Sequence, residues 1–407
     1  MMARQVTNVY GNSIHRIKTL KAKIMNKIMK QSSSETTFQT NFIQPQFVGN
    51  GIPITQSADI HLGLIIGTAN HVDPAQNINL FNLCILDLDN AKRPLATISM
   101  PFFGHGVVPD PIHPQRLCVF EKRGKGACEI DLKQGTVTRI IETKSNREFY
   151  GHGAYSPDGK LLYCTETITE GEYQGLITIR DAKTHQYLGD FPSFGSSPHD
   201  CHLINDGKTM VVTNGGGSID GSAANVSYID VSSRTLIKTL EFDNQHVNAG
   251  HLDISSEGKI AVVSAQREGL PVKSPGGISL NLEGNVLHTL TEPKQLTERL
   301  FDESLSVCID EKNDVVGATT PTGNLLTFWN LSNGKLLRYY ILPNPRGIEL
   351  SLDKKYFIIS YGQGEPAEAI SIISTDTLKH VKGSDLMHTG ITGSHLTAYS
   401  LPVELRQ

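Results

Sequence analysis

A tight polar turn leading into an apolar strand, Ser156-Pro157-Asp158-Gly159-Lys160-Leu161-Leu162-Tyr163, recurs along this chain of 407 residues. Related segments begin at Asn205, Ser255, Asp310 and Ser351. Turns rich in Asp, Asn and Gly before an apolar run are typical of β-hairpins. The chain is therefore expected to be a repeat protein built from hairpins.

A second repeated unit accompanies these turns and consists of a strand, a short polar turn and another strand. Seven such units occur about 40–55 residues apart, at 82–100, 127–142, 176–191, 226–242, 277–290, 325–342 and 369–382. A repeat of roughly 40–50 residues with four short strands is typical of a β-propeller blade. We predict an all-β fold, a seven-bladed β-propeller.

The ends of the repeat array predict how the ring closes. An apolar segment, Leu62–Gly67, precedes the first unit without a turn before it, and a spare strand, 396–400, follows the last unit. The C-terminal strand should join the N-terminal blade, which removes exposed sheet edges. The predicted domains are an N-terminal extension, residues 1–50, and one propeller, residues 51–407.

Composition excludes several classes of protein. Hydrophobic residues make up 38% and charged residues 19%, with a formal net charge of −4, which permits a large buried core and disfavours a disordered chain. We expect a monomer. The charge balance gives no reason to expect a nucleic-acid partner, and no apolar run is long enough for a transmembrane segment. The cysteines lie mostly in apolar strands without CxxC spacing, so we expect buried free thiols.

The first 35 residues are basic, with no acid before Glu35. One interpretation is an amphipathic helix after Ser13 that makes weak contact with an anionic membrane surface. The other is an extension without a fixed structure, or a start site placed too early. No uninterrupted apolar segment of an export signal follows the basic start, which favours a cytoplasmic location.

Five histidines occupy equivalent places at the start of the innermost strand of a blade: His105, His152, His199, His251 and His395. The two remaining equivalent places hold Ser306 and Gly347. Because innermost strands begin at the mouth of the central channel, the five side chains should form an arc around it. Neutral imidazole binds iron, copper and zinc, so the arc predicts a transition-metal site, with outer ring nitrogens held by acceptors such as Asp200 or a backbone carbonyl.

A structural role for these histidines is the alternative. WD-type propellers carry Gly-His pairs that support the blade through hydrogen bonds, and Gly104-His105, Gly151-His152 and Gly250-His251 are similar. Loops that return to the same face supply further candidate ligand-binding residues, namely Glu166, Asn214, Gln266 and Arg267. Tyr150, and Arg346 beside the gap at Gly347, are candidates on the same face.

Two segments carry a family resemblance. Phe149-Tyr150-Gly151-His152-Gly153 and the block around Val211-Val212-Thr213-Asn214 resemble a bacterial β-propeller family of unknown function, and the second block is similar to the broader YVTN group. The likeness covers residues 60–400. It implies export to the periplasm and a genomic position beside imelysin-type iron-uptake proteins.

Three functions follow from these patterns. The first is metal or small-ligand binding at the channel, related to iron uptake by the resemblance. The second is a lactonase-like hydrolase in which a histidine with Glu166 or Arg267 activates water. The third is an interaction scaffold that binds a protein partner on the propeller face. No catalytic residue is assigned.

Overall fold

The computed structural model describes residues 41–42, 61–73, 76–89, 96–171, 174–363 and 367–400. The chain separates into two compact units, Met1–Thr40 and Asn41–Gln407. The first unit lies outside the described residues. The amphipathic helix expected in it and the boundary expected at residue 50 lie outside them too. The division into an extension and a propeller at that residue stays a prediction.

The described strands form antiparallel sets of four that follow chain order. Six sets are continuous, and the first two are β5 (Gly104–Pro109), β6 (Arg116–Gly124), β7 (Gly126–Asp131) and β8 (Thr136–Glu142), and β9 (Arg147–Tyr155), β10 (Leu161–Ile168), β11 (Gln174–Asp181) and β12 (Tyr187–Ser196). The third and fourth sets are β13 (Pro198–Ile204), β14 (Thr209–Asn214), β15 (Asn225–Asp230) and β16 (Thr235–Phe242), and β17 (Leu252–Ile254), β18 (Ile260–Ser264), β19 (Gly277–Glu283) and β20 (Val286–Thr289). The fifth and sixth sets are β21 (Ser306–Asp310), β22 (Val315–Thr320), β23 (Leu325–Asn330) and β24 (Leu336–Ile341), and β25 (Ile348–Leu350), β26 (Tyr356–Tyr361), β27 (Ala369–Ser374) and β28 (Leu386–Met387).

The remaining set joins the two ends of the repeat array. It consists of β29 (Leu396–Tyr399), β2 (Leu64–Asp73), β3 (Ile78–Asp87) and β4 (Ala96–Met100). The pairing of β2 with β29 is antiparallel, with Leu64 opposite Tyr399 and Gly67 opposite Leu396. The C-terminal strand therefore completes the N-terminal blade, as predicted.

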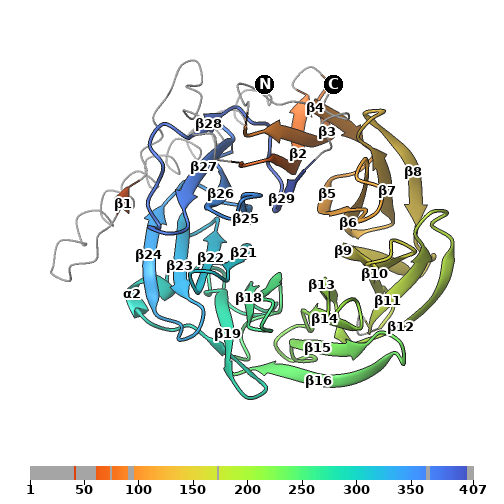
Figure 1. Ribbon diagram of the computed structural model, residues 1–407. Coiled ribbons are helices and arrows are strands. Elements are labelled where there is room, and N and C mark those ends of the chain that lie inside the picture. Colours follow the sequence, from red (N-terminus) through yellow and green to blue (C-terminus); the bar gives the residue numbers. More distant parts are fainter. Residues whose placement is uncertain are drawn as a thin grey trace, which may run out of the picture. The chain divides into compact units, whose positions relative to one another are not determined.

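The sets surround a common centre. In Figure 1 the first strands, such as β5, β9 and β13, lie toward the centre, and the fourth strands, such as β8, β12 and β16, lie at the rim. This all-β arrangement confirms the β-propeller fold. The number of blades, seven, stays a prediction. The grouping of the described strands agrees with it.

Apolar side chains from neighbouring blades pack against each other between the sheets. Leu64 and Ile66 of β2, for example, share one cluster with Leu117 and Val119 of β6. One blade alone leaves such a face exposed, so the blades are stable only as a ring. The six cysteines are all buried and free, which confirms the expectation from their apolar neighbours.

Carboxylates also link the inner strands of adjacent blades. Asp200 of β13 accepts the backbone N–H of Leu252 at 3.1 Å, and Asp253 of β17 accepts the N–H of Ile309 at 2.7 Å. These bonds fix the depth of one inner strand against the next. Equivalent residues of neighbouring blades therefore lie at matched heights along the channel.

A few elements stand outside the four-stranded pattern. The strand β1 (Asn41–Phe42) pairs in parallel with β24. In addition, β6 pairs with β9 and β16 pairs with β20, in each case a strand of the following set. The helix α2 (Lys294–Thr297) has four residues. In the described part of the chain, no helix has the length and apolar character needed to cross a bilayer.

A candidate metal centre in the central channel

The five equivalent histidines converge. His105 lies in β5, His152 in β9 and His199 in β13, and His251 and His395 come directly before β17 and β29. The first four are buried, and His395 is half-buried. The matched depth of the inner strands thus gathers side chains that are up to 290 residues apart in sequence.

Nε2 atoms face one another across the cluster. The Nε2 of His199 lies 2.7 Å from that of His251, and the Nε2 of His105 lies 3.1 Å from His251 and 3.4 Å from both His199 and His395. The candidate ligand atoms of His105, His152, His199 and His251 all lie within 4.8 Å of one another. Ligands at ~2.0–2.1 Å from one tetrahedral ion lie about 3.3 Å apart, so these four histidines can hold a metal ion.

The outer nitrogens of two histidines fix their tautomers. The Nδ1 of His199 donates to the carbonyl oxygen of Tyr150 at 2.9 Å, and the Nδ1 of His251 donates to the carbonyl oxygen of Leu305 at 2.5 Å. A carbonyl oxygen can only accept, so in the neutral ring each Nε2 carries a lone pair and no proton. Two lone pairs 2.7 Å apart repel each other, and a cation between them removes the repulsion.

The third histidine is held by a carboxylate. The Nδ1 of His152 lies 3.3 Å from Oδ1 of Asp200, the acceptor expected from the sequence. Its Nε2 is buried and has no hydrogen-bond partner among the described residues. A buried nitrogen without a partner is costly, and a metal ion at the centre of the cluster would satisfy it.

The surroundings keep the imidazoles neutral. Burial lowers the pKa of His105 well below its usual range, and the positive charge of Lys122 lowers it further. Burial also lowers the pKa of His152 to about 4, although Asp200 acts in the opposite direction. The neutral ring is the form that binds metals. The low pKa values also disfavour direct binding of an anion by imidazolium groups.

Glycines provide room for the rings. Gly151 has a φ of +110°, and a Cβ at this position would come within 2.6 Å of Cδ2 of His105. A Cβ at Gly106 would lie 2.9 Å from Nδ1 of His152. The glycines beside the histidines therefore have a packing role, which the Gly-His pairs in the sequence did not reveal.

Two of the predicted ligand-binding residues, Tyr150 and Arg346, lie beside cluster residues, and a third, Gln266, follows β18, the second strand of its blade. The ring of Tyr150 lies edge-on to His199, with the ring centroids 6.0 Å apart. Nη2 of Arg346 is 3.5 Å from Oγ of Ser394, which precedes His395. Gln266 pairs its backbone with Asp302, and its side-chain oxygen is buried without a partner among the described residues.

The other three predicted residues are engaged elsewhere. Glu166 accepts hydrogen bonds from Thr143, Thr178 and Arg180. Asn214 bonds with Ser193, Asn225 and Ser227, and Arg267 donates to five backbone carbonyl groups that include those of Gly217 and Gln245. The structure does not bring these three side chains into the histidine cluster. Their role in ligand binding stays a prediction.

Sequence reasoning missed Lys122. This residue lies in β6, where its Cα pairs with that of Tyr150, and its charge lowers the pKa of four of the five histidines. The available signal was the position of Lys122 and Arg123 near the end of a strand whose central residues, 117–120, are apolar. That signal was weak, because charged residues commonly end strands at a surface.

The family can now be assigned. A family model described as a protein of unknown function (DUF1513) matches residues 98–388, more than half of the chain. The chain belongs to the DUF1513 family. The resemblance to a family of unknown function is thereby confirmed, whereas the YVTN likeness and the genomic neighbourhood stay predictions. No curated protein sequence matches the chain significantly.

Solved structures share the fold of this DUF1513 chain. Hydrazine synthase from Kuenenia stuttgartiensis is similar with a TM-score of 0.59 and 14% identity, over 83% of this chain and 100% of that chain. The β-propeller domain of Cps50 (Swd1) from Myceliophteria thermophila has a TM-score of 0.53 and 13% identity, over 76% and 97%. A chain of the mitotic checkpoint complex has a TM-score of 0.50 and 14% identity, over 69% and 76%. At these identities the likeness shows the fold alone.

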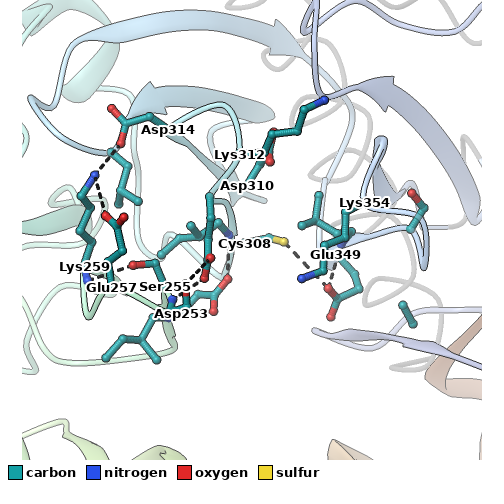
Figure 2. A pocket seen from close by; sticks show the side chains of 18 of the residues that line it. Asp253, Ser255, Glu257, Lys259, Cys308, Asp310, Lys312, Asp314, Glu349 and Lys354 are labelled. Atoms are coloured by element: carbon teal, nitrogen blue, oxygen red, sulfur yellow. Dashed lines mark hydrogen bonds and ion pairs between the residues drawn. The ribbon is translucent and has the colours of Figure 1, made fainter. Parts of the chain in front are cut away.

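A second feature of the DUF1513 chain is a cavity of ≈ 730 Å³ deeper along the inner strands. Asp253, Cys308 and Glu349 line it, each two residues beyond one of the equivalent positions 251, 306 and 347. Figure 2 shows the Cys308 sulfur directed toward Glu349, with Sγ 3.9 Å from Oε1. The part of the next layer that lines this cavity is thus acidic. Among the described residues, candidate ligand atoms gather closely enough to hold a metal ion only at the histidine cluster.

Glu349 makes the stability of the fold depend on pH. Burial raises its pKa to about 7, and the charge of Asp253 contributes in the same direction. The folded protein therefore holds a proton that the unfolded chain has released, so stability falls as pH rises from about 4.5 to about 7. We expect Glu349→Gln to raise the free energy of unfolding at pH 8 by on the order of 1 kcal/mol and to change it little at pH 5.

Urea unfolding at the two pH values measures this difference. The matched control is Glu257→Gln, because Glu257 lines the same cavity with a largely exposed side chain. An equal effect of both substitutions, or none at pH 8, would contradict the assignment of the raised pKa to Glu349.

Proposed function

We propose that this protein binds a transition-metal ion through the histidine cluster of its central channel. The observation that carries the proposal is the 2.7 Å separation between the Nε2 atoms of His199 and His251, whose Nδ1 atoms both donate to carbonyl groups. Hydrogen bonding cannot account for two acceptor nitrogens at this distance. A shared cation accounts for it, and it also satisfies the buried Nε2 of His152.

The donor set restricts the metal. All candidate ligands are neutral imidazoles, which suit iron, copper and zinc and do not suit the oxygen-preferring magnesium or calcium ions. The half-buried His395 lies beside the four buried histidines as a further donor. We propose iron handling as the physiological context, because the resemblance to a family with iron-uptake neighbours supports it.

Metal analysis tests the proposal directly. Protein purified without a histidine tag, dialysed and then incubated in turn with Fe²⁺, Cu²⁺ or Zn²⁺, should retain about one ion per chain. Elemental analysis after gel filtration gives the ratio, and a chelator should remove the ion. A protein that retains none of the three ions at stoichiometric amounts would refute the proposal.

The hydrolase and scaffold functions have less support. The carboxylate of Glu166 and the guanidinium of Arg267 are engaged in hydrogen bonds within the fold, so neither is placed to activate water beside a histidine. A rim that binds a protein partner is a common use of propellers, but the convergence of five histidines is not needed for it. Metal binding is the function that uses the convergence.

A further inference from the structure

The charges around the histidine cluster do not balance once a metal is bound. A divalent ion on neutral imidazoles keeps its full charge, and two further cations, Lys122 and Arg346, lie close to the same histidines. Asp200 is the carboxylate nearest His152, and it also accepts two backbone N–H groups and lies 3.6 Å from His202. An excess of enclosed positive charge is unfavourable unless an anion compensates it.

The position of Lys122 follows from strand register. Its Cα pairs with that of Tyr150, whose carbonyl oxygen holds the Nδ1 of His199. The side chain is half-buried and makes no hydrogen bond or ion pair with the residues that the structure describes. An ammonium group in this state has donors available for a ligand.

Arg346 approaches the cluster from another blade. It precedes β25, and its single side-chain hydrogen bond in the described chain is the 3.5 Å contact with Ser394, the neighbour of His395. Its Nε is buried without an acceptor among the described residues. The blades that carry Lys122 and Arg346 are those on either side of the composite blade, which carries His395.

Two carboxylates oppose this positive region. Asp200 lies beside His152, and Glu303 lies close enough to raise the pKa of both Lys122 and Arg346. Their two negative charges balance at most half of the positive charge of a divalent ion, Lys122 and Arg346 together. The half-buried His395 is the member of the cluster most accessible to solvent, and we infer that a ligand approaches the centre from its side.

We propose that the metal centre takes an oxyanion ligand, a carboxylate or phosphate group, that binds the ion and is held by Lys122 and Arg346. This inference rests on the proposed metal site and names the class of ligand that completes it. The guanidinium of Arg346 matches two oxygens of such a group, and the ammonium of Lys122 supplies a point charge. The ligand itself neutralises the excess charge of the site.

The test uses the full chain loaded with Co²⁺, whose visible absorption reports changes in coordination. Oxalate and inorganic phosphate are titrated separately at constant ionic strength, with chloride as the reference anion. We expect oxalate or phosphate to change the spectrum until the change saturates. The anion that saturates at the lower concentration shows whether a carboxylate or a phosphate is the better ligand. Lys122→Met and Arg346→Met should each weaken this anion binding at least about ten-fold. Co²⁺ should still bind, with the same or higher affinity, because each substitution removes a positive charge near the ion.

The control is Lys133→Met, which removes an exposed lysine and should leave both affinities unchanged. Lys122→Gln and Arg346→Lys serve as second variants if a methionine variant fails to fold, as judged by circular dichroism. Co²⁺ binding without an anion effect, or with equal anion affinity in parent and variants, would overturn the oxyanion inference and leave the metal proposal standing. Absence of Co²⁺, Fe²⁺, Cu²⁺ and Zn²⁺ binding would overturn both.

Discussion

Replacing His199 and His251 together with alanine should weaken metal binding by at least about a hundred-fold, because it removes the two nitrogens that lie closest together in the cluster. The fold should survive. Both side chains lie at the start of inner strands rather than between the apolar faces of the blades, and each substitution removes the repulsion from its partner. Isothermal titration with the metal that the parent retains measures the affinity, and thermal unfolding measures stability.

The control for this variant is His113→Ala combined with His246→Ala, which removes two exposed histidines. This control should bind metal as the parent does. A double variant of His199 and His251 that fails to fold, with metal-free parent protein fully stable, would instead favour the structural role in which these histidines support the blades.

Replacing Leu396 with aspartate should cost about 3 kcal/mol or more of unfolding free energy. Leu396 is 5% exposed and packs in one apolar cluster with Ile65 and Ile358. It also belongs to the strand that closes the ring against β2. A buried carboxylate at this position both loses the apolar contact and loosens the closure, so unfolding should begin from the composite blade. Urea unfolding gives the free energy.

The matched control is Leu337→Asp in β24, because Leu337 is 45% exposed. Its effect should remain within about 0.5 kcal/mol, as for most surface substitutions. Equal stability of the two variants would mean that the C-terminal strand contributes little to the ring, contrary to its role in closure.

The repeats in the sequence were sufficient to predict the fold and its closure. A turn of the type Asp158-Gly159 before an apolar strand depends on local chemistry, since glycine and aspartate adopt the turn and apolar residues favour the strand. The same period placed His105 and His152 at equivalent positions. Because a closed ring converts equivalent sequence positions into equivalent radial positions, the convergence of the histidines could also be predicted.

The loop residues could not be placed in this way. Glu166 lies within β10 and Asn214 ends β14, and Arg267 follows β18, so only the last of the three is in the expected loop. Their hydrogen-bond partners come from loops and neighbouring strands whose paths do not repeat. A charged side chain reaches whichever partner lies within a few ångströms, and the sequence period does not record that distance. The side chains therefore bind within the fold rather than at the channel.

The amino-acid sequence alone is enough to tell which residues share a depth in the ring, because depth follows from the repeat. Which of the two ring nitrogens of a histidine points inward depends instead on acceptors from other blades, such as the carbonyl oxygens of Tyr150 and Leu305. The place of Lys122 beside the cluster likewise depends on strand pairing between two blades. These features emerge only when whole sheets pack against each other, and a single strand carries no record of such contacts.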